Sequence, residues 1–131
     1  MTVTAVHAAP SATIETAKVS RRLATYIVRR IIRSAHLKAS DTFEGIDLCH
    51  AEFRGAIDLA QEIHAIDWDT RNALIDANRE LTQLHGAILR FLQRKVSERT
   101  GLRPDLTKGF QPTLERAKEL AKRIDPTIII A

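Results

Sequence analysis

The chain has 131 residues, of which 44% are hydrophobic and 27% charged, with a formal net charge of +4 at neutral pH. This length suits one domain with its own core, and this composition excludes a generally disordered chain. The single cysteine, Cys49, excludes an internal disulfide, and no apolar run reaches the ~20 residues that a membrane span needs. We therefore expect a soluble, cytoplasmic protein that does not use a membrane.

The four prolines outline the expected helices. They stand at positions 10, 104, 112 and 126, so residues 11–103 contain none. Because proline breaks helix interiors, this spacing predicts an all-α protein, an up-down helical bundle of three long helices plus a shorter fourth. The expected division is a loose N-terminal tail at 1–12, a helical bundle domain at 13–126 and an apolar C-terminal tail at 127–131.

The first helix is predicted over residues 13–38, and most of it is strongly basic. Between Lys18 and Lys38 there are seven bases and no acid. On a helical wheel most of them lie away from the predicted apolar face, which consists of Ala17, Ala24, Val28, Ile31, Ile32 and Ala35.

Such a basic face attracts phosphates without reading sequence. Tyr26 falls inside the basic arc, where its ring can stack on a base; the alternative is that it lies at the edge of the core. We predict that the outer face of this helix contacts a nucleic-acid backbone through Lys18, Arg21, Arg22, Tyr26, Arg29, Arg30 and Arg33.

The second helix is predicted to begin at Asp41, where Asp41-Thr-Phe-Glu44 resembles a capping box with aspartate as the cap. Between Asp41 and Asp69 there are eight acids and one base, Arg54, so this segment has a formal charge of −7. Its acids also fall opposite the apolar face, so we expect both charged faces to point to solvent. That apolar face is predicted to consist of Ile46, Cys49, Phe53, Ala56, Ile57 and Ala60.

The third helix is predicted from near Asp67 or Asp69 to about Thr100, before Gly101, with a buried seam of Leu74, Ala77, Leu81, Leu84, Ile88 and Phe91. Its basic end, with Arg90 and Arg94, is expected level with the end of the first helix and to extend the basic patch. The fourth helix is predicted from Pro112 to about Ile124 and should bury Leu114, Ala117, Leu120, Ala121 and Ile124.

Some apolar residues exceed what one core face per helix requires. They are either covered by the fourth helix and the C-terminal tail, or they form an interface between subunits, since large exposed apolar patches mark contacts. On the second reading the chain is a homo-oligomer or a subunit of a larger complex, and its partner interface is predicted at Leu48, Leu59, Ile66, Ile128, Ile129 and Ile130.

Signals for chemistry are weak. Asp47-x-x-His50 is a single copy of a motif that bundle metal sites use in pairs, and His64 is expected to be a core histidine, so we expect no metal and no cofactor. The segment from Arg79 to His85 resembles the Arg-x(4–6)-His motif of HEPN-type ribonucleases, which are also small helical bundles. That resemblance implies RNA cleavage that depends on His85.

Charge and helix patterning together favour a binding protein over an enzyme. The expected function is that of a non-enzymatic helical module, a subunit of a nucleoprotein assembly, which contacts nucleic acid in a sequence-tolerant way or binds an acidic protein surface. The alternative is a protein-binding inhibitor or adaptor of phage or plasmid type, acting through the acidic second helix or the apolar stripes. The third hypothesis is a small HEPN-like ribonuclease.

Overall fold

The computed structural model describes residues 2–94 and 108–130, with side chains from Glu15 onward. Four α-helices make up the fold, α1 (Thr2–His36), α2 (Phe43–Glu62), α3 (Trp68–Gln93) and α4 (Gln111–Ile124), and a short 3-10 helix, η2 (Lys108–Phe110), precedes α4. The described ranges contain no strand, so the all-α bundle predicted from the sequence is confirmed.

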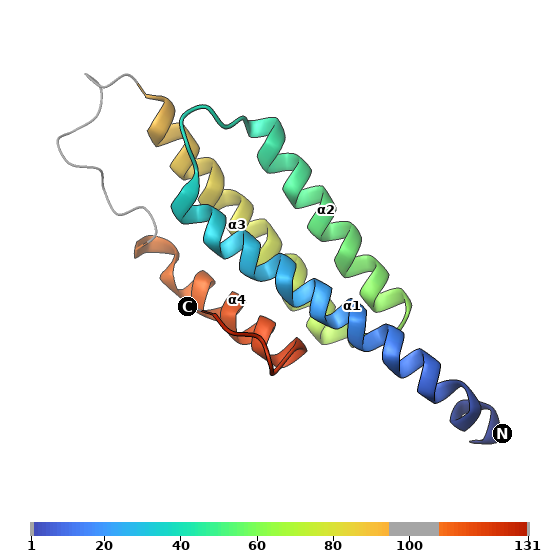
Figure 1. Cartoon of the computed structure of the whole chain (residues 1–131). Coiled ribbons are helices and arrows are strands. Elements are labelled where there is room, and N and C mark those ends of the chain that lie inside the picture. Colours follow the sequence, from blue (N-terminus) through green and yellow to red (C-terminus); the bar gives the residue numbers. More distant parts are fainter. Residues whose placement is uncertain (1, 95–107, 131) are drawn as a thin grey trace.

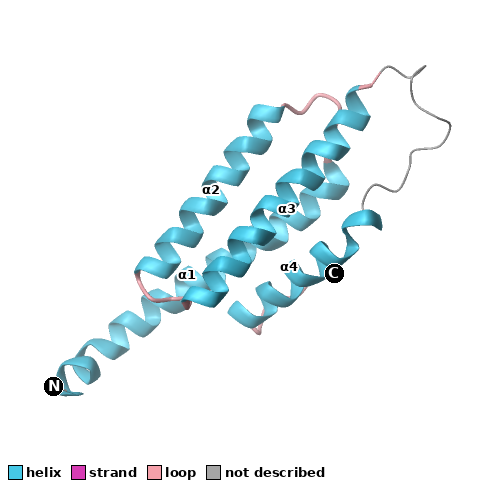
Figure 2. Ribbon diagram, turned by 180° about the vertical axis from the view of Figure 1, so that it is seen from behind, coloured by secondary structure: helices cyan, strands magenta, loops and turns pink. Residues whose placement is uncertain are grey.

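The helices are arranged with α1 and α3 on opposite sides of the bundle. Figure 1 shows α1 in front, flanked by α2 and α4, and Figure 2 shows α3 in the same position from behind. α1 and α3 run toward one end of the bundle, while α2 and α4 run back. One face of α1 therefore packs on all three other helices and the opposite face looks outward.

The ends of the helices correct three predictions. α1 begins at Thr2, so the predicted loose tail is helical from that residue, and the helix continues through Pro10. The cap of α2 is Thr42, whose Oγ1 accepts from the backbone N–H of Gly45 at 3.0 Å. α3 ends at Gln93, because Arg94 is extended; the predicted continuation to Thr100 and the stop at Gly101 lie outside the described residues.

The turn between α2 and α3 is closed by a residue that was expected in the core. His64 is exposed and has φ 62°, the left-handed conformation that usually requires glycine or asparagine after a helix. Its N–H donates to the carbonyl of Gln61 at 3.0 Å, and the N–H of Ala65 donates to the carbonyl of Ala60 at 2.8 Å. These two bonds form a Schellman motif, which ends α2, so the prediction of a core histidine is wrong.

The core face of α1 is rotated from the predicted one. Leu23, Ala24 and Ile27 are fully buried, whereas Ile32 is 52% exposed and Ala35 is exposed. The true face continues through two polar residues, Arg30 and Ser34, to Leu37. Counting apolar residues alone missed it, because buried polar residues occupy part of the stripe.

The other predicted core faces are found, with most members buried. α2 buries Ile46, Phe53, Ile57 and Ala60, and α3 buries its whole predicted seam. The α4 face is buried as far as Ala121, and Ile124 packs against the core. Within the described part of the chain, no helix is long and apolar enough to cross a bilayer.

Candidate nucleic-acid interface

The outer face of α1 carries four exposed bases. Lys18, Arg21, Arg22 and Arg29 line a shallow depression together with Thr25, and no other helix contributes to it. Helical periodicity explains the arrangement, because these residues recur at three- and four-residue steps opposite the buried face. Their one described ion pair joins Lys18 to Glu15 over 3.8 Å, and both of its side chains are mostly exposed.

The opposite charges of α1 and α2 do not neutralise each other across their seam. Among the described side chains, no ion pair joins a base of α1 to an acid of α2. This agrees with the prediction that both charged faces point to solvent. The bases on α1 therefore leave a positive surface that is available to an anion.

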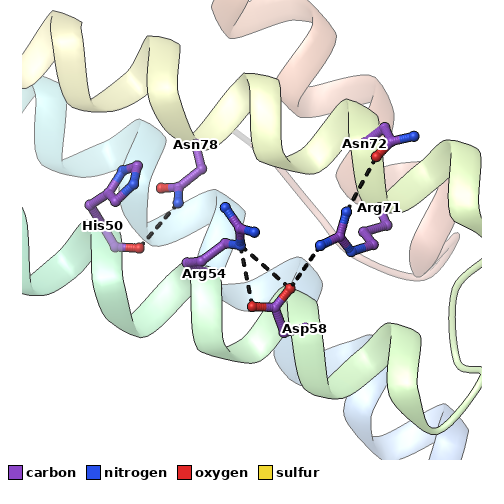
Figure 3. Close-up of polar contacts among 6 residues, drawn as sticks. All are labelled: His50, Arg54, Asp58, Arg71, Asn72 and Asn78. Atoms are coloured by element: carbon purple, nitrogen blue, oxygen red, sulfur yellow. Dashed lines mark hydrogen bonds and ion pairs between the residues drawn. The ribbon is translucent and has the colours of Figure 1, made fainter.

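Oppositely charged side chains pair with one another at the seam between α2 and α3. Asp58 accepts from Nε of Arg54 at 3.2 Å and pairs with Nη2 of Arg71 at 3.3 Å (Figure 3). Arg71 also donates to Asn72, and its guanidinium lies 4.7 Å from the ring centroid of Trp68. This chain of contacts fastens α2 to α3 and neutralises Asp58, one of the acids predicted to face solvent.

Arg30 does not lie on the exposed outer face of α1. It is 3% exposed, and its guanidinium points between α2 and α3, where Nη1 donates to the carbonyl of Cys49 at 3.3 Å and to Oδ1 of Asn78. Nη2 donates to Oγ1 of Thr82 at 2.7 Å. The prediction that Arg30 contacts nucleic acid is therefore wrong, since its hydrogen-bonding groups are directed into the bundle.

The charge of Arg30 has no acidic partner. Within residues 15–94 and 108–130 no carboxylate pairs with it, and its acceptors are a carbonyl, an amide and a hydroxyl. Burial lowers the pKa of Arg30 to about 10, so the side chain remains a cation at neutral pH. The ring of Phe53, whose centroid is 5.8 Å from the guanidinium carbon, adds a cation–π contact.

The polar core joins three helices through one hydroxyl. Oγ1 of Thr82 gives its single proton to the carbonyl of Asn78 at 2.8 Å, so it accepts from Arg30 and from His50, whose Nδ1 lies 2.8 Å away. That assignment places the proton of His50 on Nδ1. The amide of Asn78 completes the network by donating to the carbonyl of His50 at 3.1 Å (Figure 3).

Both histidines near Arg30 are held neutral. Burial, followed by the charge of Arg30, lowers the pKa of His50 and lowers that of His85 to about 4. His85 is fully buried, and its Nε2 donates to the backbone carbonyl of Arg30 at 2.9 Å. Nδ1 of His85 is buried without a hydrogen-bond partner among the described atoms.

The remaining predicted contacts divide by position. Arg33 is half-buried, and its side chain extends to the start of α2. Its Nη2 lies 3.9 Å from the place where a Cβ atom on Gly45 would be. Arg90 is exposed on α3, across the bundle from the outer face of α1, and packs over Gly86. Arg94 is exposed at the end of α3, near the α1–α2 connection, which Gln93 reaches by donating to the carbonyl of Asp41 at 2.9 Å. Neither Arg33 nor Arg90 lines the depression on α1.

Tyr26 lies at the boundary between core and surface. It is half-buried, and its ring is nearly parallel to that of Phe53, with an interplanar angle of 7° and a centroid distance of 6.2 Å. It also lines a groove between α1 and α2. Tyr26 therefore lies at the edge of the core, as one of the two readings predicted, and its contact with a base stays a prediction.

The predicted partner interface is only partly exposed. Leu48 and Leu59 on α2 are 64% and 51% exposed, and Ile129 is also exposed. The other three residues pack against the core instead. Ile66 does so from the α2–α3 connection, and Ile128 and Ile130 do so because the chain turns after α4 and lies back along it.

The residues of the HEPN-like motif are separated in the fold. Arg79 is exposed and paired with Asp76, whereas His85 is fully buried beside Arg30, so the described conformation does not assemble them into one site. The described residues also contain no group of three or more histidine, cysteine or acidic side chains that would hold a metal ion.

Comparisons with protein-family models, with curated proteins and with solved structures give no match for this chain.

Proposed function

We propose that this protein is a helical binding module, a subunit of a nucleoprotein assembly, that contacts a nucleic-acid backbone through the outer face of α1. The contact set consists of Lys18, Arg21, Arg22 and Arg29. The observation that carries the proposal is that the four outer bases share one exposed depression and that no acid of α2 neutralises them.

Stability does not explain this arrangement of charge. Exposed ion pairs contribute at most ~1 kcal/mol, and like charges along one face repel one another. A phosphate backbone relieves that repulsion and gains entropy by releasing its condensed counterions. Binding of this kind tolerates any sequence and weakens steeply with salt.

A salt titration tests the proposal. With three to four phosphates neutralised, log K against log[salt] on duplex DNA should have a slope of about −3 to −4. Replacing Arg21, Arg22 and Arg29 with glutamine should flatten the slope by up to about 3 units, because these contacts release the counterions. Fluorescence anisotropy with a labelled duplex between 50 and 200 mM salt measures both slopes.

The matched control removes the same charge elsewhere. Arg79, Lys108 and Lys122 are exposed and lie outside the depression on α1, so their triple glutamine variant has the same net charge as the first. It should keep the wild-type slope to within about 1 unit. Equal losses in both variants would show that only net charge matters, and no retention of the wild type near 50 mM salt would reject the proposal.

One observation favours a second function, that of a protein-binding adaptor. Leu48 and Leu59 are exposed on α2, whose surface also carries exposed acids such as Glu44 and Glu62. An apolar stripe with acidic flanks fits a basic protein partner. The same titration separates the two functions, since an adaptor of this kind has no reason to bind DNA.

A further inference from the structure

A groove between α1 and α2 adjoins the basic face. Its α1 wall consists of Lys18, Val19, Arg22, Leu23 and Tyr26, and its α2 wall of Glu52, Gly55, Ala56 and Leu59. The groove measures about 350 Å³, near the lower end of the ~300–1,000 Å³ typical of small-ligand pockets. It therefore suits one flat ring system better than a larger ligand.

The groove is continuous with the proposed phosphate-binding surface. Lys18 and Arg22 line both the groove and the depression that also includes Arg21 and Arg29. A ligand that fills the groove thus lies beside bases that attract its phosphates. Among the described residues that line the groove, Glu52 is the one acid. It repels phosphate, so the uncharged part of the ligand belongs on the α2 side.

Tyr26 gives the groove a fixed aromatic surface. Its ring packs nearly parallel to the fully buried ring of Phe53, which in turn lies against the guanidinium of Arg30. Because Phe53 and Arg30 are immobilised in the core, the orientation of Tyr26 is set before any ligand arrives. A preorganised aromatic ring next to bases is the arrangement by which proteins stack unpaired nucleobases.

Gly55 keeps the groove open. A Cβ at this position would meet no atom within 4 Å, so no close packing requires glycine here. Glycine inside an exposed helix costs about 1 kcal/mol relative to alanine. What the missing side chain provides is space in the groove that Gly55 lines.

We propose that this groove takes one unstacked base of a single-stranded nucleic acid, while the flanking phosphates lie along Lys18, Arg21, Arg22 and Arg29. The proposal rests on the proposed function and adds the class of nucleic acid to it. A duplex keeps its bases stacked and offers only its phosphates, so it uses the depression alone.

The experiment compares a labelled 12-nucleotide single strand of mixed sequence with the duplex of the same sequence at one salt concentration. Gly55→Leu fills the groove without meeting a neighbouring atom at Cβ, and Tyr26→Leu removes the stacking surface but keeps an apolar side chain. A stacked base contributes about 1–3 kcal/mol, so each variant should bind the single strand about 5- to 150-fold more weakly. Duplex affinity should stay within about twofold of the wild type.

Ala51→Leu is the matched control, because Ala51 is exposed on the same helix but does not line the groove. It should bind both nucleic acids like the wild type. Circular dichroism of all three variants checks that the fold is retained, and the ratio of single-strand to duplex affinity is insensitive to a partial loss of folded protein.

The outcomes distinguish the two proposals. If the wild type binds neither nucleic acid, the proposed function itself fails. Suppose instead that the wild type binds both nucleic acids and that the Gly55→Leu and Tyr26→Leu variants keep their single-strand affinity. The proposed function then stands, and the groove proposal is overturned. A groove that binds a protein side chain gives this result. An equal loss on duplex and single strand overturns it as well.

Discussion

The two faces of α1 use the same residue type for opposite purposes. On the inner face, Arg30 donates to three acceptors from α2 and α3 and is almost fully buried. On the outer face, its neighbour Arg29 is exposed and lines the shallow depression. The comparison teaches that position on the helix, and not the density of bases along the sequence, decides which arginines are free to bind a partner.

The largest expected effect comes from exchanging these neighbours for alanine. Arg30→Ala should lower the free energy of unfolding by about 3–5 kcal/mol, because it leaves a cavity and removes the donor to three acceptors that are buried or partly buried. Arg29→Ala should change it by no more than ~0.5 kcal/mol. Urea denaturation of both variants measures the difference, and similar values would contradict the assignment of Arg30 to the core.

The second effect depends on pH and sharpens the description of the inner face. The folded pKa of His85 is about 4 and its ordinary value is 6.5, so between these values the unfolded state binds the extra proton. Stability should therefore be complete above pH 6.5 and should fall by about 3 kcal/mol as the pH drops toward 4. His50, whose pKa is also lowered, contributes in the same direction.

Two histidine variants isolate this effect in urea denaturation at several pH values. His85→Leu should lose most of the pH dependence between 6.5 and 4, even though its absolute stability changes. His36→Leu alters an exposed histidine at the end of α1 and should keep the wild-type dependence. A His85→Leu variant with an unchanged pH profile would show that another group titrates.

The smallest effect concerns one acceptor of Arg30. Thr82→Val removes a hydroxyl that accepts from Arg30 and His50 but nearly preserves side-chain volume, so unfolding should become easier by about 2 kcal/mol. Thermal denaturation of Thr82→Val beside Thr25→Val, on the outer face, compares the two environments. A smaller loss at position 82 than at position 25 would mean that the polar network adds nothing to stability.

The sequence predicted most of the fold because three of the helices are conventionally amphipathic. The α3 seam from Leu74 to Phe91 and the start of α4 at Pro112 follow directly from apolar spacing and proline placement. On α1 the same reasoning failed, since the true stripe, Leu23, Ile27, Arg30, Ser34 and Leu37, includes two polar residues. Its regular spacing of four and three was visible, but the burial of Arg30 depends on acceptors from α2 and α3.

The candidate site was foreseen in part. Helical periodicity placed Lys18, Arg22 and Arg29 on the outer face, as found. The groove beside Tyr26 was not foreseen, because it depends on how closely α1 and α2 approach and on the absence of a side chain at Gly55. Sequence patterns predict the faces of single helices, whereas the shape of a groove depends on how two helices pack together.

The polar network also has a consequence for the order of folding. Every acceptor of the Arg30 guanidinium belongs to α2 or α3, two helices joined by a short turn and by the contacts of Asp58. Contacts between residues close in sequence form with little loss of chain entropy, whereas Arg30 and Thr82 are far apart along the chain. The α2–α3 hairpin is thus expected to assemble first, with the acceptors of Arg30 already side by side. When α1 then packs on the hairpin, only one position along its axis lets Arg30 reach all of these acceptors.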